Sequence, residues 1–293
     1  MQAQDIALER LQIADLVSLT KPGLTLLAVA TAVGGAYLAS ETSLSIQQIG
    51  VTFLATALAG AGAATINQYL ERDLDARMRR TVNRALPAGR VTPPAALTFG
   101  VLCSVLGVAL FAVLGHILAA GLTVVTLGTY LGLYTPLKRL TPWASIVGAV
   151  PGALPPMIGW AVVRENLSLD GWSLFAILFI WQIPHFFSLA LVYRNDYARA
   201  GFRTLSVSDE DGQKTAWQVL LYSIALLPAS VLPTAFGLLG HLYAAGAIVL
   251  SCAFLVLAIR LFARPENRTA RALFLGSLVY LPLLVALMVV DRL

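Results

Sequence analysis

Residues 49–75 read IGVTFLATALAGAGAATINQYLERDLD. The first part of this stretch stays apolar for about twenty residues, which is enough for a helix to cross the hydrocarbon core of a bilayer. Its last part, from Asn67 to Asp75, changes to amide, acidic and basic side chains. The stretch therefore predicts a transmembrane helix that leads directly into a polar, charged loop.

The composition of the whole chain agrees with this interpretation. Of the 293 residues, 58% are hydrophobic and only 12% are charged, and the mean hydropathy is +0.79. A soluble domain has about a quarter charged residues and somewhat under half apolar residues. The composition therefore favours a chain that lies largely in lipid.

Nine apolar segments recur along the chain, at about residues 22–40, 49–69, 94–114, 117–134, 143–163, 171–192, 216–237, 240–261 and 270–290. Backbone groups in lipid must be hydrogen-bonded within their own segment, so these segments are expected to be helices. We therefore expect an all-α, polytopic membrane helix bundle with nine transmembrane helices. It would form a single domain over residues 1–293, with residues 1–20 as a cytoplasmic N-terminal segment.

The basic residues are distributed unevenly between the two ends of these segments. If the nine segments cross the membrane, 18 of the 20 lysines and arginines lie on the same side of the membrane as the N-terminus. Only Arg164 and Arg292 lie on the other side. Because basic loops stay in the cytoplasm, we expect a cytoplasmic N-terminus. The net charge of +5 then reflects topology, and no nucleic-acid partner is expected. Residues 1–20 resemble neither a signal nor a transit peptide, so we expect the inner (plasma) membrane of a bacterium.

Three side chains in the polar stretch are spaced so that they share one face of a helix. Asn67, Glu71 and Asp75 follow each other at intervals of four residues, whereas Asp73 falls on another face. The shared face offers an amide oxygen and two carboxylates, which are ligands that Mg²⁺ prefers. Arginines, which bind phosphate in a forked geometry, surround the acids: Arg72, Arg77, Arg79, Arg80 and Arg84. The alternative is an ordinary solvated loop.

Two further polar patches follow the fourth and sixth apolar segments, at the same predicted membrane depth. The first contains Tyr134 and Lys138, and the second contains Asp196 and Arg199. Lys138 and Arg199 are candidate phosphate ligands, Asp196 is a candidate cation ligand, and Tyr134 is a candidate neighbour of a cationic intermediate. We expect the three patches to converge on one cytoplasmic-side pocket.

At these residues the chain resembles the UbiA superfamily of intramembrane prenyltransferases. The first motif of that family, N-x-x-x-D/E-x-x-x-D, is matched by Asn67, Glu71 and Asp75. Within the superfamily, the chain is most similar to the branch that farnesylates protoheme IX. This narrower resemblance covers about residues 16–210 and rests on strings that include L19-T-K-P22, N83-R-A-L-P-A-G-R90, Y134-T-P-L-K-R139 and W181-Q-I-P-H-F186.

The resemblance implies a catalytic metal site and a diphosphate site. Mg²⁺ would be held by Asn67, Glu71, Asp75 and Asp196, which would be the catalytic residues. Arg72, Lys138 and Arg199 would bind the diphosphate. The second family motif is usually D-x-x-x-D, but Ala200 stands where the second acid would be, and Asp209 and Asp211 are possible substitutes.

The resemblance also implies the reaction. A farnesyl group would pass from farnesyl diphosphate to a vinyl group of protoheme IX (heme B), with Mg²⁺ as cofactor, to give heme O. The lipid bilayer would surround the enzyme. A heme-modifying or terminal-oxidase assembly protein is a possible downstream partner.

His185 and Trp181 lie within the sixth apolar segment. A polar residue inside a membrane helix is a functional candidate, and an imidazole can bind heme iron. We therefore expect His185 to be a candidate heme contact, and Trp181 to line the substrate pocket or to anchor at an interface. The alternative for His185 is a hydrogen-bonded core histidine beside Pro184.

Two other functions are compatible with parts of this pattern. A UbiA-type enzyme acting on an aromatic quinone precursor would keep Asn67, Glu71 and Asp75. A transporter with a cytoplasmic cation site belongs to another class, but transporters place polar residues near the middle of the membrane. Because the acids here cluster at one interface, an enzyme is favoured.

Overall fold

The computed structural model describes residues 13–41 and 43–292, and these residues form helices and no β-strand. Part of the expected N-terminal segment, with Arg10, lies outside the described residues. The first described helix is the short α2 (Ile13–Leu19). Two other short helices, α11 (Arg194–Ala200) and α12 (Leu205–Ser208), connect longer ones.

Nine helical segments of the described residues are long and apolar enough to cross a membrane. This confirms the prediction of an all-α bundle with nine such helices. They are α3 (Pro22–Ala39), α4 (Ile46–Asp75), α5 (Pro93–Val113), the run of α6 (Ile117–Leu127), η1 (Gly128–Tyr134) and α7 (Thr135–Leu137), the pair α8 (Ala144–Ala153) and α9 (Pro155–Arg164), α10 (Leu169–Val192), α13 (Gln213–Ala235), α14 (His241–Ala263) and α15 (Asn267–Val290).

Local sequence explains where several of these helices begin. Ser45 caps α4, because its hydroxyl accepts from the backbone N–H of Gln48 while the Gln48 side chain accepts from the backbone N–H of Ser45. Pro22 and Pro155 stand at the first positions of α3 and α9, where a missing N–H costs nothing. Pro155 also separates α9 from α8, as expected for a proline within an apolar segment.

The surface of the bundle is apolar where helices face outward. Large exposed side chains include Leu102 and Val105 on α5, Val249 on α14 and Val279 on α15. Inside, the helices approach closely through small residues, as is usual in membranes. A Cβ atom at Gly159 of α9 would lie 1.7 Å from the carbonyl oxygen of Ala32 on α3. The protein is therefore an integral membrane protein with lipid-facing outer helices.

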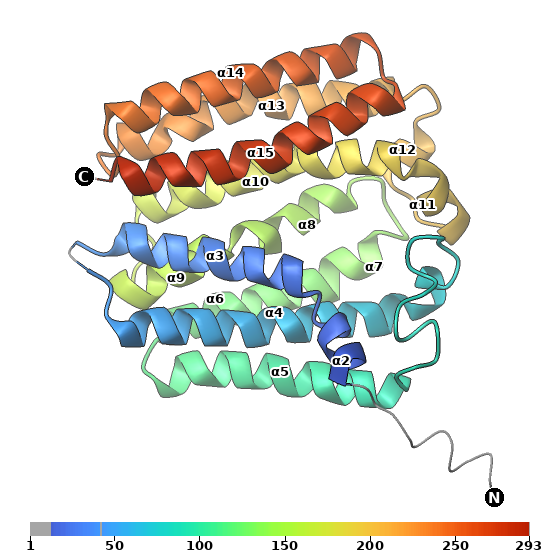
Figure 1. Cartoon of the computed structure of the whole chain (residues 1–293), viewed down its shortest axis with the longest axis horizontal. Coiled ribbons are helices and arrows are strands. Elements are labelled where there is room, and N and C mark those ends of the chain that lie inside the picture. Colours follow the sequence, from blue (N-terminus) through green and yellow to red (C-terminus); the bar gives the residue numbers. More distant parts are fainter. Residues whose placement is uncertain (1–12, 42, 293) are drawn as a thin grey trace, which may run out of the picture.

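The long helices run roughly side by side, and their charged connections gather at one end (Figure 1). We call this the polar end. It comprises the turn between α2 and α3, the C-terminal part of α4, residues 76–92, residues 138–143, and the segment with α11 and α12. Segments that are far apart in sequence thus meet at one end of the bundle.

Candidate active site at the polar end

The motif residues lie on a helix and not on a loop. The sequence predicted that the second span ends near residue 69, but α4 continues without a break to Asp75. It can continue because this part of α4 is buried by other segments of the protein. Asn67, Glu71 and Asp75 therefore project from one rigid face.

Burial separates these three residues from their acidic neighbour. Asn67, Glu71 and Asp75 are buried, and the Asp75 side chain is only 1% exposed. The Asp73 side chain is 76% exposed and points to the other side of the helix. The helical spacing in the sequence thus distinguished the buried acids from the exposed one.

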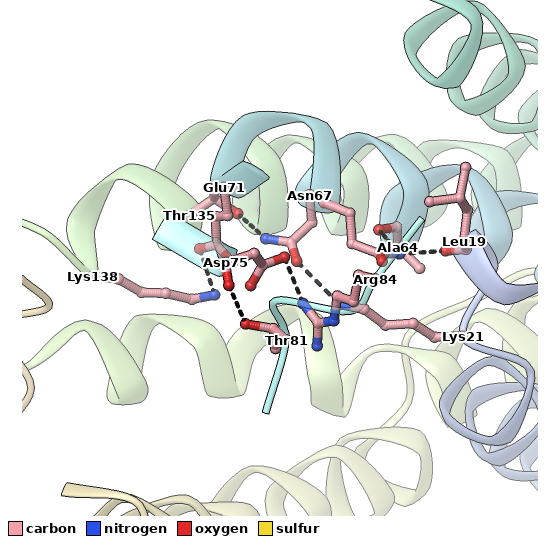
Figure 2. Close-up of polar contacts among 11 residues, drawn as sticks. Leu19, Lys21, Ala64, Asn67, Glu71, Asp75, Thr81, Arg84, Thr135 and Lys138 are labelled. Carbon is pink, nitrogen blue, oxygen red and sulfur yellow. Dashed lines mark hydrogen bonds and ion pairs between the residues drawn. The ribbon is translucent and has the colours of Figure 1, made fainter. Parts of the chain in front are cut away.

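Three basic side chains from three different segments meet this face (Figure 2). Lys138 Nζ lies 2.8 Å from Glu71 Oε1, and Arg84 Nη1 lies 2.7 Å from Asp75 Oδ2. Lys21 Nζ donates a hydrogen bond of 3.2 Å to Asn67 Oδ1. Each motif residue therefore has its own cation.

Lys21 reaches the site from the turn between α2 and α3. Its backbone is left-handed, with φ 47° and ψ 64°, which costs a residue with a side chain about 1 kcal/mol or more. Gln68 holds this turn against α4 by donating a 2.6 Å hydrogen bond to the Leu19 carbonyl. Burial, reinforced by the nearby charges of Arg84 and Lys138, lowers the pKa of Lys21 to about 7.

Lys138 is placed by an irregular part of the fourth span. The seven residues Gly128–Tyr134 form a π-helix, a wider turn that often occurs at functional sites. Lys138 Nζ lies 4.5 Å above the centre of the Tyr134 ring. Burial disfavours the charge of Lys138, but Tyr134 and Glu71 outweigh this and raise the pKa of Lys138 above its ordinary value. Thr135, which follows Tyr134 in the chain, accepts a 3.2 Å hydrogen bond from Asn67 Nδ2.

Arg84 comes from the loop that follows α4. The Thr81 hydroxyl donates a 2.7 Å hydrogen bond to the backbone carbonyl of Asp75, which folds the loop back over the end of the helix. Leu86 and Val91 of the same loop are buried with Leu19 in a small apolar cluster. The loop is thus a packed structure that holds Arg84 beside Asp75.

Arg72, which was predicted to bind substrate, points elsewhere. Its guanidinium lies 4.8 Å from the centre of the Tyr69 ring, and Nη1 donates a 2.8 Å hydrogen bond to the Tyr69 carbonyl. The nearest acid is the exposed Asp73, at 3.9 Å. Arg84 and not Arg72 is the arginine that contacts the acidic face.

The third patch adjoins the first two. Backbone N–H of Arg203 donates a 3.0 Å hydrogen bond to the Lys138 carbonyl, and Arg80 lies 5.2 Å from the centre of the Tyr193 ring. Within the patch, Asp196 accepts from Arg199 one turn later on α11. The three predicted patches are thus neighbours, although Asp196 forms no hydrogen bond or ion pair with Asn67, Glu71 or Asp75 in the described structure.

The position of the missing second acid is filled by an apolar contact. Ala200 is fully buried with Leu74, Met78 and Phe202, where α11 packs on the end of α4. The two possible substitutes contact helix α13. Asp209 accepts from the backbone and hydroxyl of Thr215, both at 2.7 Å, and Asp211 accepts from the backbone of Gln213 at 3.0 Å. Both carboxylates therefore stabilise the start of α13.

His185 and Trp181 lie deeper in the bundle, between α10 and α15. Their rings are stacked with centres 5.1 Å apart. His185 Nδ1 lies 2.7 Å from Ser277 Oγ, and Trp181 Nε1 donates a 3.2 Å hydrogen bond to the Ser277 carbonyl. The two residues therefore form a second cluster, which is separate from the polar end.

The polar cluster has oxygen ligands for a hard cation and basic side chains for an anion. Among the described residues no three His, Cys, Asp or Glu side chains are grouped closely enough to hold a metal ion. The Asn67 amide adds an oxygen to the two carboxylates, and Glu71 Oε2 and Asp75 Oδ1 accept no hydrogen bond from the described residues. This set suits Mg²⁺, which commonly takes one or two carboxylates and completes its shell with phosphate oxygens.

The fold and this site define an integral membrane protein that gathers oxygen ligands and cations at one end of its spans. The chain matches the UbiA prenyltransferase family over residues 28–283, and it belongs to that family. It is therefore a prenyltransferase, and the transporter alternative is set aside.

Relatives and solved structures agree with this assignment. The chain is 42% identical to "Protoheme IX farnesyltransferase" of Solibacter usitatus, covering 95% of this chain and 98% of the relative. It is 43% identical to the protein of the same name from Opitutus terrae, covering 95% of each. A digeranylgeranylglyceryl phosphate synthase structure shares the fold with a TM-score of 0.81 at 15% identity, over 95% of this chain and 98% of that one. A UbiA homolog from Archaeoglobus fulgidus bound to GPP and Mg²⁺ matches with a TM-score of 0.67 at 14% identity, over 94% of this chain and 99% of that one.

Proposed function

We propose that the protein transfers a farnesyl group from farnesyl diphosphate to a vinyl group of protoheme IX, which gives heme O. The observation that carries this proposal is the identity of 42–43% with proteins named protoheme IX farnesyltransferase over 95% of the chain. The buried acidic face of α4 and its three cations supply groups that such a reaction needs.

The cations of the polar end bind the diphosphate. Lys21, Arg84 and Lys138 carry more positive charge, when all are protonated, than Glu71 and Asp75 offset. The C–O bond of farnesyl diphosphate leaves its electron pair on the diphosphate as it breaks. Fixed cations that meet this developing charge lower the barrier, because they need no reorganisation during the reaction. Arg199 is the candidate for a further contact from α11.

Asn67, Glu71 and Asp75 would hold Mg²⁺, with Asp196 as a fourth candidate ligand. When bound, Mg²⁺ would supply Lewis-acid neutralisation of the diphosphate. The helix α4 sets the spacing of the three ligands. The π-helix and the 76–92 loop set the cations around them.

The remaining steps need a dry site and an aromatic environment. The vinyl π electrons form a bond to C1 of the farnesyl cation, water adds to the neighbouring vinyl carbon, and one proton is released. Apolar helices keep other water away until the carbon–carbon bond has formed. The Tyr134 ring, beside Lys138, is the candidate neighbour of the farnesyl cation. Trp181 and His185 are the candidate contacts of the heme.

The polar end would face the cytoplasm of a bacterial cell, in the inner membrane. The uneven distribution of lysine and arginine supports this orientation. A cysteine replacing the exposed Asp73 should react with a membrane-impermeant maleimide only in inside-out vesicles. A downstream protein that receives heme O stays a prediction, as does the single-domain organisation.

A direct assay tests the proposed reaction. Membranes that contain the protein are supplied with heme B, farnesyl diphosphate and Mg²⁺, and heme O is sought by chromatography and mass spectrometry. Heme O that depends on the protein and on the divalent cation is the expected result. Prenylation of an aromatic quinone precursor, without heme O, would overturn the heme assignment. No prenyl transfer to either acceptor would contradict the proposal as a whole.

A further inference from the structure

His185 lies in the apolar part of the bundle, where a hydrogen-bonding side chain requires a reason. It precedes the end of α10 at Val192 by seven residues, or about 10 Å along the helix axis. Its ring is half-buried among Trp181, Phe186 and Phe274. The cluster therefore lies deeper in the membrane than the polar end. This depth suits a heme whose reacting edge points toward the polar end.

The hydrogen bonds of Ser277 determine which nitrogen of His185 carries the proton. A serine hydroxyl has one hydrogen to donate, and Ser277 Oγ donates it to the Phe274 carbonyl at 2.6 Å. Ser277 Oγ, 2.7 Å from His185 Nδ1, must then accept from that nitrogen. This network assigns the proton of a neutral His185 to Nδ1 and leaves Nε2 with a lone pair.

The opposite nitrogen, Nε2, is not used by the fold. No described residue forms a hydrogen bond with Nε2, and this atom is not fully buried without a partner. The hydrogen bond at Nδ1 is enough to join α10 to α15, so Nε2 remains available for a ligand. An accessible lone pair on the other side of a fixed ring is the arrangement of a metal-binding histidine, whose second nitrogen is held by an outer partner.

The ring is also held in orientation. Trp181 stacks on His185 at 5.1 Å, and the centre of the Phe274 ring lies 5.0 Å away. Trp181 Nε1 bonds the carbonyl of the same Ser277 that accepts from His185. Two side chains of α10 are therefore anchored on a single residue of α15, and the direction of Nε2 is fixed relative to both helices.

We infer that Ser277 is a positioning residue, which holds His185 Nδ1–H so that Nε2 binds the iron of the substrate heme as an axial ligand. This inference rests on the proposed function, because it assumes that heme is the acceptor. The iron contact would place the macrocycle on the side of the His185 ring that faces away from Ser277. It would leave a vinyl group to approach the farnesyl chain that extends from the polar end.

The test uses the full chain, purified in detergent, and ferric heme as the probe. Heme affinity is measured by absorbance titration, and the axial ligand is identified by resonance Raman and electron paramagnetic resonance. His185→Ala should lose the nitrogen-ligand signature, and added imidazole should restore it. Ser277→Ala should keep the ligand but weaken heme binding about ten-fold.

A matched control separates positioning from general packing. Ser251 is another fully buried serine in the bundle, bonded to Ser230 and Tyr280 on neighbouring helices. Ser251→Ala should leave heme affinity and the iron spectrum unchanged. If Ser277→Ala behaves like Ser251→Ala, or if His185→Ala keeps the wild-type spectrum, the inference is wrong.

The same variants distinguish this inference from the proposed function. A His185-dependent iron spectrum without heme O formation would support the ligand and overturn the proposed reaction. Heme O formation together with an iron spectrum that is insensitive to His185 would do the reverse.

Discussion

The two acid-bearing helix ends at the polar end are built in different ways. On α4, a 30-residue helix, Glu71 and Asp75 are buried, and each pairs with a cation from outside the helix. On α11, a helix of seven residues, Asp196 pairs with Arg199 one turn away, and the arginine is exposed. The first site is assembled by the tertiary fold, whereas the second is local.

This difference has an energetic consequence. Charges buried with partners from other segments stay oriented without a substrate, because their rotamers and neighbours are already fixed. A pair within one helix whose arginine is exposed contributes little and can rearrange, as surface pairs are worth about 0–1 kcal/mol. We therefore expect α4 to provide most of the preorganised electrostatics, and α11 to adjust to the bound substrate.

Of the replacements that compare the two helix ends, Asp75→Asn is expected to reduce prenyl transfer most. It removes a negative charge from the buried face and leaves Arg84 without its carboxylate partner. Prenyl transfer should fall about a hundred-fold or more, as for loss of one charged group at a reacting centre. The rate of heme O formation, normalised to the amount of inserted protein, is the measurement.

Asp73→Asn is the matched control for that replacement. Asp73 stands on the same helix two residues earlier, but its side chain is exposed. It should retain nearly full activity and insert normally. Equal losses in the two variants would mean that net charge at the polar end matters more than the buried face.

Lys138→Met should have the next largest effect. It removes the cation from Glu71 and from the diphosphate while keeping a side chain of similar length. We expect a loss of about 10- to 100-fold. Arg139→Gln is the control, because the side chain of the exposed Arg139 donates to the Leu70 carbonyl and to no acid among the described residues. A comparable loss in Arg139→Gln would mean that both residues act by orienting the chain in the membrane, and not by contacting the substrate.

The sequence predicted the bundle and the acidic face well because both follow from local rules. Nine apolar segments predict nine helical spans, since lipid permits little else. The spacing of Asn67, Glu71 and Asp75 defines a shared face wherever the segment is helical. The largest difference in length is at the end of α4, because the polar composition of residues 70–75 resembles an interfacial loop when its tertiary partners are unknown.

The cations were harder to assign because their positions depend on long-range folding. Lys21 contacts Asn67 from 46 residues away, through a left-handed turn that no spacing rule predicts. Its occurrence in the string L19-T-K-P22 was the available signal. Five arginines surround the acids in the sequence, and only the folded structure shows that Arg84 returns to Asp75 while Arg72 turns toward Tyr69.

Asp196→Asn should have a smaller effect, of about ten-fold or less. Its carboxylate has a local partner, and it does not contact the α4 ligands in the described structure. The loss should appear mainly as a raised KM for farnesyl diphosphate or for Mg²⁺. A side chain that adjusts to the substrate contributes mainly to substrate binding and less to kcat. A loss as severe as that of Asp75→Asn would show that the two helix ends act as one metal site.

Arg72→Gln should have the smallest effect, below about two-fold. The structure holds this guanidinium against the Tyr69 ring and carbonyl, on a face of α4 that does not carry Asn67, Glu71 and Asp75. Arg84→Gln, in contrast, removes the partner of a buried carboxylate, and such a loss is costly. Steady-state kinetics of both variants, at several farnesyl diphosphate concentrations, make the comparison. A strong loss in Arg72→Gln alone would mean that the arginine leaves Tyr69 when substrate binds, and that the exposed side of α4 closes over the diphosphate.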